Sequence, residues 1–241
     1  MINTFLFDLD GTLLPLDMDR FMKLYFDELG KCFSDMISPE VLYKYIWEST
    51  EAMVTNTDYR TNEEVFMDKF SSLIDGNIET YQSRFDAFYD HEFLNVKASV
   101  QSMPLIKECI SILKEKSYEL VVATNPLFPK KAILHRIVWA GLDPKDFTYI
   151  TSYENNHYCK PQIKYYEEIL NEIKKSPEQC IMVGNDVQED LIASKLGVKT
   201  YLITDNMIHR SKNDFITDYK GTYQEFYDYV CGLDPVSDTL T

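Results

Sequence analysis

The sequence predicts an α/β fold: a doubly wound parallel sheet of about five strands, with an α-helical region inserted after the first strand. Three observations lead to this prediction. Between residues 118 and 190, short apolar runs alternate with amphipathic stretches, the pattern that builds parallel sheets from βαβ units. The apolar run that begins at Thr4 is continuous, as expected for a strand buried on both faces. Residues 16–100 contain no comparable run and place apolar side chains at helical spacing.

The expected strands are short apolar runs bounded by polar or turn-forming residues. They begin at Thr4 and, further along the chain, span residues 119–124, 147–151, 180–184 and 200–204. Amphipathic stretches between them predict helices over residues 105–116, 129–140, 161–174 and 189–196. Prolines stand near several helix starts, where the missing N–H of proline costs little. The sequence leaves the order of the strands open.

The region after the first strand predicts a small helical bundle. Phe21, Tyr25 and Leu29 recur at the spacing of one helix face. Turn-forming residues interrupt this pattern at positions 38–39, 55–61 and 75–77. The interruptions divide the region into about four helices, a number that suits a bundle.

We therefore expect two domains and a short tail. Residues 1–15 and 101–234 would form the core that contains the sheet, and residues 16–100 would form a helical cap inserted into it. Residues 235–241 are polar, and we expect a flexible tail there.

Composition and charge limit the partners of the chain. A length of 241 residues with 45% hydrophobic content is sufficient for a buried core. The formal net charge of -15 argues against binding to nucleic acid, which depends on basic surfaces, and against anionic membranes. An anionic substrate would need a local bound cation and well-placed donors, because the average field of the protein repels it.

The cysteines and the N-terminal segment indicate where the protein works. The five cysteines are scattered and form no C-x-x-C pair, so neither a zinc site nor a disulfide framework is expected. No basic region with an apolar stretch precedes the first strand, and no apolar run is long enough to cross a bilayer. We expect a protein of the reducing cytoplasm; the oligomeric state is left open.

Polar side chains suited to catalysis stand at four places where the chain leaves a strand or enters a helix. Asp8 and Asp10 belong to a D-L-D-G-T segment directly after the first strand. The other three places hold Thr124 with Asn125, Lys160 before a proline, and Asp186 with Asp190. Because ligands of open α/β sheets bind beyond the carboxyl ends of the strands, we expect these side chains to share one site.

These segments resemble the four motifs of the haloacid dehalogenase superfamily of hydrolases. The motifs are D-x-D-G-T, a Thr or Ser after the second strand, a Lys, and a G-D/N-D-x-x-x-D stretch, and all four are present in order. The helical region is similar to the type-1 cap of the phosphoglucomutase-like branch of subfamily I. The resemblance covers the whole chain and implies a Rossmann-like core whose cap closes over the substrate.

Phosphoryl transfer requires a nucleophile, a metal ion and donors for the phosphoryl oxygens. Together with the resemblance, this requirement implies that Asp8 is the nucleophile that forms an aspartyl-phosphate. It also implies that Asp10 is the general acid and base. Mg²⁺ would be bound by the Asp8 carboxylate, the Asp10 backbone carbonyl and Asp186, since magnesium prefers oxygen ligands. The Thr124 hydroxyl, the Asn125 backbone N–H and the Lys160 ammonium would bind the phosphoryl oxygens.

Two assignments concern residues around this set. Asp190 would orient Lys160 or a metal-bound water. Arg20 either contacts an anionic end of the substrate or is an ordinary exposed helix arginine, and the second interpretation is favoured. The aromatic residues Tyr25, Phe26 and Trp47 are expected in the core of the helical bundle rather than stacked on a substrate.

Each motif also has an ordinary structural explanation. An Asp-Gly-Thr segment is often only a turn, a lysine before a proline is often solvated, and Asp186 is suited to cap a helix. All of these explanations would have to coincide at successive strand ends. The joint functional interpretation is therefore favoured.

The sequence thus predicts a Mg²⁺-dependent phosphatase that acts on a small phosphorylated metabolite. A phosphomutase would share every core residue, and a phosphonate hydrolase would add a cap lysine, for which Lys23 and Lys44 are the candidates. Carbon–halogen cleavage is disfavoured by the presence of Asp10. A catalytically silent phosphate-binding or scaffold protein is the alternative of a different class, disfavoured because no motif residue is missing.

Overall fold

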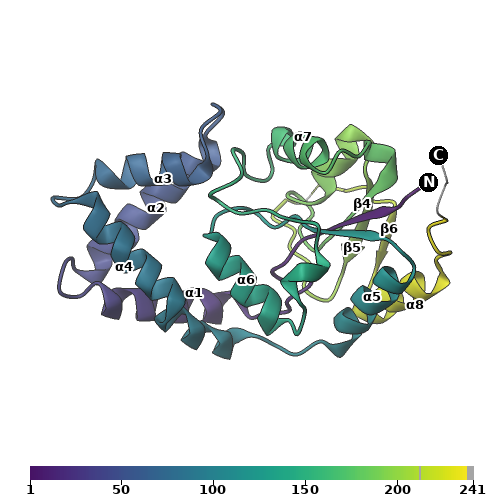
Figure 1. Ribbon diagram of the computed structural model, residues 1–241, viewed down its shortest axis with the longest axis horizontal. Helices are drawn as coiled ribbons and strands as arrows, with labels where there is room; N and C mark the ends of the chain where they lie inside the picture. Colours follow the sequence, from purple (N-terminus) through teal and green to yellow (C-terminus); the bar gives the residue numbers. More distant parts are fainter. Residues whose placement is uncertain (212, 238–241) are drawn as a thin grey trace.

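Six parallel strands form one sheet in the part of the chain that the computed structural model describes, residues 1–211 and 213–237 (Figure 1). They are β1 (Thr4–Phe7), β2 (Glu119–Val122), β3 (Tyr149–Ile150), β4 (Cys180–Gly184), β5 (Lys199–Ile203) and β6 (Tyr219–Gly221). Their order across the sheet is β3-β2-β1-β4-β5-β6, so β1 lies between β2 and β4.

The central position of β1 follows from its side chains. Phe5, Leu6 and Phe7 are fully buried, which only a strand with neighbours on both edges and layers on both faces achieves. Phe7 pairs in register with Val122 of β2 and Val183 of β4. The carboxyl ends of these three strands therefore meet at one edge of the sheet.

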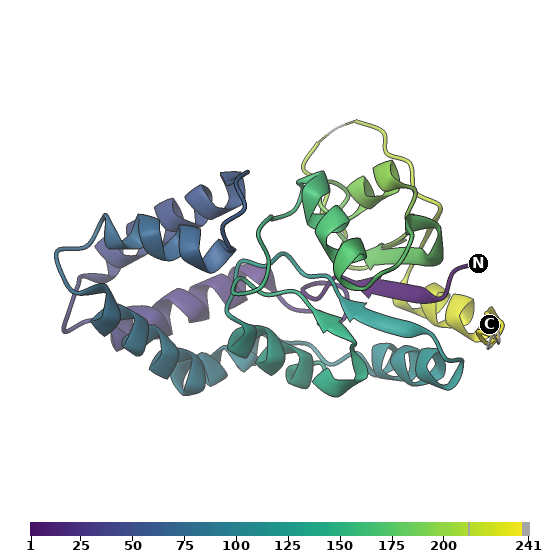
Figure 2. The same ribbon diagram turned by 45° about the horizontal axis from the view of Figure 1, so that its top comes forward.

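Helices cover both faces of the sheet, as Figure 2 shows. The face of Phe5 and Phe7 packs against α5 (Pro104–Glu115), α6 (Lys130–Trp139) and α8 (Tyr223–Gly232). The face of Leu6 packs against α7 (Ile163–Glu172) and the 3₁₀ helix η4 (Leu191–Leu196). This two-sided cover confirms the predicted doubly wound α/β fold.

The structure corrects several predicted elements. Strand β6 was not predicted, because its three residues form no apolar run and only Gly221 is buried. Helix α8 was also not predicted, although Tyr223, Phe226 and Val230 are buried on one face of it. The helix expected over 189–196 is a 3₁₀ helix that begins at Leu191, after a turn. The strand expected over 147–151 is limited to the two residues of β3.

The inserted region consists of four α helices and a 3₁₀ helix among the described residues (Figure 1). They are α1 (Met18–Cys32), α2 (Pro39–Thr55), α3 (Asn62–Ser71), α4 (Ile78–Asp90) and η1 (Glu92–Ser99). The two chain crossings to the sheet lie side by side, because Leu16 and Val100 form an antiparallel bridge. The Gln101 N–H also donates to the Pro15 carbonyl at 2.9 Å. The division into domains at these crossings stays a prediction.

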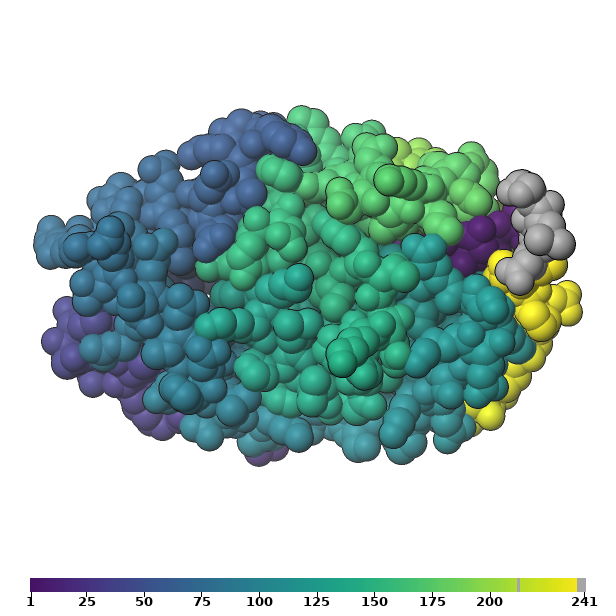
Figure 3. Space-filling view, in the orientation of Figure 1, coloured from purple at the N-terminus to yellow at the C-terminus, as the bar shows by residue number. Residues whose placement is uncertain are grey.

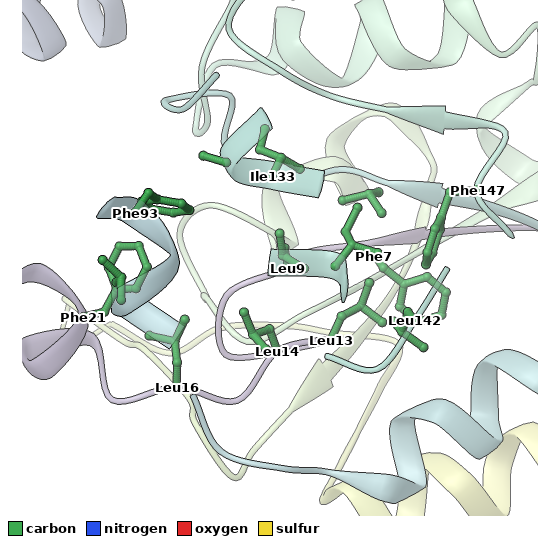
Figure 4. Close-up of a cluster of buried hydrophobic side chains, with 14 of the residues drawn as sticks. Phe7, Leu9, Leu13, Leu14, Leu16, Phe21, Phe93, Ile133, Leu142 and Phe147 are labelled. Atoms are coloured by element: carbon green, nitrogen blue, oxygen red, sulfur yellow. The ribbon is translucent and has the colours of Figure 1, made fainter. Parts of the chain in front are cut away.

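The apolar core continues from the sheet into the helical region (Figure 4). The segment after β1 supplies Leu9, Leu14 and Leu16, which connect Phe7 to the aromatic cluster around Phe93. In the space-filling view the two parts form one elongated body (Figure 3). Through these contacts the helical region packs on the segment that follows β1.

The C-terminal segment returns to the sheet side. The Val236 N–H donates to the Lys116 carbonyl at 2.8 Å, and the Tyr118 hydroxyl donates to the Asp234 carbonyl at 2.9 Å. Residues 238–241 of the predicted tail lie outside the described residues. In the described part of the chain, no helix has both the length and the apolar character needed to span a bilayer.

Candidate active site

A cavity of about 290 Å³ opens between the carboxyl edge of the sheet and the helical region. Its sheet end is lined by Asp8, Asp10, Thr124, Asn125, Asn185, Asp186, Glu189, Asp190 and Arg210. All the candidate residues predicted at the strand ends, apart from Lys160, thus face one cavity. Lys160 contacts two of the lining carboxylates.

Lys160 joins Asp8 and Asp190 in one buried ionic group. Its Nζ donates to Asp8 Oδ1 at 2.9 Å and to Asp190 Oδ1 at 2.7 Å. The second oxygen of Asp190 accepts from the Asp186 N–H at 2.9 Å. Gly184 makes this approach possible, because a Cβ at that position would lie 2.1 Å from Asp190 Oδ2. The predicted neighbourhood of Asp190 and Lys160 is thus a direct contact.

Burial sets the charge balance in this group. It raises the pKa of Asp8 to about 6 and that of Asp190 to about 7, although Lys160 acts in the opposite direction on both. Burial alone would lower the pKa of Lys160, but the two carboxylates raise it well above its ordinary value. Lys160 therefore stays a charged donor. The carboxylates of Asp8 and Asp190 are buried, and burial makes their ionisation unfavourable.

Asp10 is held by an arginine that the sequence analysis did not single out. Arg136 of α6 donates from Nη1 to Asp10 Oδ2, and its guanidinium lies 4.5 Å from the ring centre of Phe128. Asp10 Oδ1 and Arg136 Nη2 are buried and have no hydrogen-bond partner among the described residues. One carboxylate oxygen and one guanidinium nitrogen thus remain available to a ligand.

Asp186 is fixed through both of its oxygens. Its Oδ1 accepts from the N–H groups of Gln188 at 2.9 Å and Glu189 at 3.0 Å. Its Oδ2 pairs with Nη1 of Arg210 at 2.6 Å. Arg210 reaches this position because Ile208 forms a parallel bridge with Asp186. Both carboxylate oxygens of Asp186 are therefore engaged within the protein.

Thr124 and Asn125 close the site beside Lys160. The Thr124 carbonyl accepts from the hydroxyls of Tyr165 at 2.8 Å and Thr151 at 2.7 Å. Asn125 Oδ1 accepts from the Lys160 N–H at 3.2 Å, and its Nδ2 donates to Glu189 at 3.1 Å. The side chain of Asn125 thus ties together the loops that carry the other candidates.

Two predictions about the helical region turn out differently. Arg20 is exposed near the start of α1 and does not line the cavity, and its role stays a prediction. Tyr25 is buried, but Trp47 is 65% exposed and lines the cavity, so its expected place in the bundle core is wrong. The spacing of apolar residues along α2 does not define which side of the helix faces the cavity.

The sequence analysis missed three charged residues of the site. Arg136 had a signal, because Ile133, Arg136 and Ile137 stand at the spacing of one buried helix face. A lone arginine on such a face requires a buried anion. Glu189 and Arg210 lie in a turn and a polar loop, where charge is ordinary, and gave no signal.

The charges of the site suit one divalent cation. Five carboxylates line the cavity, whereas three cationic side chains contact them: Lys160, Arg136 and Arg210. In residues 1–211 and 213–237, no cluster of three acidic, histidine or cysteine side chains could hold a metal alone. Asp8 and Asp186 with the Asp10 carbonyl would leave further positions to water, which Mg²⁺ commonly retains.

Comparison with known proteins gives a family and several relatives. A family model described as haloacid dehalogenase-like hydrolase matches residues 2–197. Glyceraldehyde 3-phosphate phosphatase of Methanothermobacter thermautotrophicus is 26% identical over 221 residues, 88% of this chain and 90% of that protein. Pyrophosphatase PpaX of Anoxybacillus flavithermus is 24% identical over 199 residues, 83% of this chain and 82% of that protein.

The fold also matches solved structures. A HAD phosphatase from Thermococcus onnurineus superposes with a TM-score of 0.60 at 20% sequence identity, covering 98% of this chain and 100% of that chain. At this level of identity the likeness concerns the fold alone, and it agrees with the doubly wound sheet described above.

Proposed function

The chain belongs to the haloacid dehalogenase-like hydrolases, and from this premise we propose that it is a Mg²⁺-dependent phosphatase of small phosphorylated metabolites. The observation that carries the proposal is the position of Asp8, which leaves the central strand at the cavity with Lys160 on one oxygen. Two relatives named as phosphatases support the same activity.

In the proposed reaction the Asp8 carboxylate attacks the phosphorus of the ester. The bond to the alcohol oxygen breaks, and the alcohol leaves with a proton from Asp10. Asp10 then takes a proton from a water molecule, which attacks the aspartyl-phosphate and releases inorganic phosphate with free Asp8. Bound Mg²⁺ would neutralise charge on the phosphoryl oxygens.

The other residues position the reacting groups. Lys160, the Thr124 hydroxyl and the Asn125 backbone N–H are the proposed donors to the phosphoryl oxygens. Arg136 holds Asp10 Oδ2, so Oδ1 is the oxygen that can exchange a proton with the alcohol or the water. Arg136 is in this scheme a positioning residue.

The alternatives on the same core receive less support. A phosphonate hydrolase would need a cap lysine at the cavity, whereas Lys23 and Lys44 are exposed and neither lines it. A phosphomutase must bind a second phosphate group, and no basic residue of the helical region lines the cavity in the described part of the chain.

The direct test is phosphate release from a panel of phosphomonoesters with Mg²⁺ and with a chelator. Metal-dependent release that is lost in Asp8→Asn supports the proposal. Full activity in Asp8→Asn would remove Asp8 as the nucleophile. No release from any ester by the wild-type protein would overturn the proposed function.

A further inference from the structure

The two ends of the cavity differ in chemical character. Every charged residue on its wall belongs to the sheet side. The helical region contributes apolar and aromatic side chains and Thr50; among the apolar ones are Met18, Met22, Phe26, Trp47, Phe66 and Met67. Tyr25 and Tyr89 also reach the wall, but their hydroxyls are hydrogen-bonded to each other at 2.9 Å. This end offers almost nothing to a charged group.

We propose that the leaving group of the substrate is an apolar or aromatic alcohol that binds among the side chains of the helical region. The inference rests on the proposed function, because the phosphoryl group must sit at Asp8. A second phosphate or a carboxylate at the other end would be buried without a counter-charge, which costs far more than burial of an apolar group gains.

The three cations beside the cavity are each bonded to a carboxylate, and the unpartnered Nη2 of Arg136 lies next to Asp10 at the sheet end. Lys160 is shared by Asp8 and Asp190, Arg136 is paired with Asp10, and Arg210 is paired with Asp186. All three lie at the sheet end, where they balance carboxylates. Arg20, the first basic residue of α1, is exposed and absent from the wall.

The helical end is suited to an aromatic ring in particular. Trp47 lines the cavity and is 65% exposed, so much of its indole surface is free of contacts within the protein. Met22 and Met67 line the same cavity, and methionine adapts to rings of different shape. The cavity volume of about 290 Å³ suits a phosphoryl group and one ring.

The proposed leaving group differs from the leaving groups of the compounds in the names of the two relatives. Their names refer to glyceraldehyde 3-phosphate and to pyrophosphate, whose leaving groups are polar or charged. The shared core motifs do not require a shared leaving group, because the core binds only the phosphoryl end.

The test compares benzyl phosphate with glycerol 3-phosphate and phosphoglycolate at fixed Mg²⁺. These substrates are all esters of alkyl alcohols, so the comparison avoids the activated leaving group of an aryl phosphate. We expect kcat/KM for benzyl phosphate to be at least about tenfold higher, mainly through a lower KM, as for an extra apolar group in a fitting pocket. A higher kcat/KM for either polar ester would overturn the inference while leaving the phosphatase proposal in place.

Two variants locate the effect. Trp47→Ala should raise KM for benzyl phosphate about three- to tenfold, the range of one aromatic contact, with little change for glycerol 3-phosphate. Val41→Ala is the matched control on the same helix, because Val41 is exposed and does not line the cavity. Equal effects of Trp47→Ala on both esters would contradict a ring-binding role.

A binding measurement keeps the two proposals separable. Benzylphosphonate and phosphonoacetate carry non-hydrolysable carbon–phosphorus bonds, so their affinities can be compared by calorimetry with the full chain and Mg²⁺. Tighter binding of benzylphosphonate supports the apolar site independently of turnover. Tighter binding of phosphonoacetate would overturn the inference even if the protein proves to be a phosphatase.

Discussion

The two ends of the cavity are built by different physical means. At the sheet end, carboxylates are held by cations and backbone N–H groups, as in the contacts of Lys160 with Asp8 and Asp190. At the helical end, apolar side chains such as Met22 and Trp47 form the wall. On the proposed function, the sheet end carries the chemistry and the helical end selects the leaving group. Substitutions at the first end should act on kcat, and substitutions at the second should act on KM.

This separation follows from how each kind of contact tolerates change. A buried ion pair that loses one partner leaves an uncompensated charge, so few substitutions are tolerated at either partner. An apolar wall keeps its function when side chains of similar volume are exchanged. The helical end should therefore tolerate more substitutions than the sheet end.

The largest effect is expected for Asp8→Asn. The amide cannot form the aspartyl-phosphate, so kcat should fall by about 10³-fold or more, as for loss of other nucleophiles. Burial raises the pKa of Asp8 to about 6, so a neutral amide is tolerated there and the melting temperature at pH 8 should not decrease. Phosphate release and thermal unfolding measure the two effects. A folded variant with wild-type kcat would contradict the assignment of the chemistry to the sheet end of the cavity.

Much of the sheet end could be predicted because its residues directly follow strands. Asp8 and Asp186 are each within two residues of a buried strand, so the position of the strand fixes the side chain. Local sequence order is enough to place such residues at one edge of a parallel sheet. The predicted fold of the core is confirmed for the same reason.

The remaining features depend on how helices are rotated and docked, which sequence order does not fix. Arg136 reaches Asp10 only because α6 turns one particular face to the cavity. Trp47 lies on the cavity wall and is not among the buried residues of α2. Strand β6 is short and has little apolar content, so no local sequence pattern predicts it. It is held in the sheet by its pairing with β5.

The second prediction concerns the cation behind Asp10. Arg136→Met removes the partner of a partly buried carboxylate that should exchange protons with the substrate, so kcat should fall about 10- to 100-fold, near the range of one acid–base contribution. KM should change less, because Arg136 does not line the helical end. Arg136→Lys keeps the charge and should recover part of the loss. An unchanged kcat in both variants would remove the positioning role.

The third prediction concerns pH and the stability of the metal-free protein. The pKa of Asp190 is about 7 in the folded chain against an ordinary 3.8, so between these values the folded chain binds more protons than the unfolded chain. The free energy of unfolding should therefore decrease as pH rises through this window. In Asp190→Asn the free energy of unfolding should decrease less steeply between pH 5 and 7 than in the wild type, by about 1 kcal/mol per pH unit.

Urea unfolding at pH 5, 6 and 7 with a chelator measures this slope. Asp234→Asn is the control, because Asp234 is exposed and lies outside the site. The same slope in wild type and Asp190→Asn would mean that Asp190 is already ionised throughout the window.

The smallest effect is expected for Arg20→Ala. This variant tests whether the helical end of the cavity lacks a charged residue that reaches the substrate. Arg20 is exposed and does not line the cavity, so kcat/KM for benzyl phosphate and for phosphoglycolate should both change less than about twofold. Steady-state kinetics on the two esters is the measurement. If KM for phosphoglycolate alone rose in this variant, Arg20 would reach the bound carboxylate when the helices close. The helical end would then carry a charge of its own, and the separation between a charged chemical end and an apolar selecting end would fail.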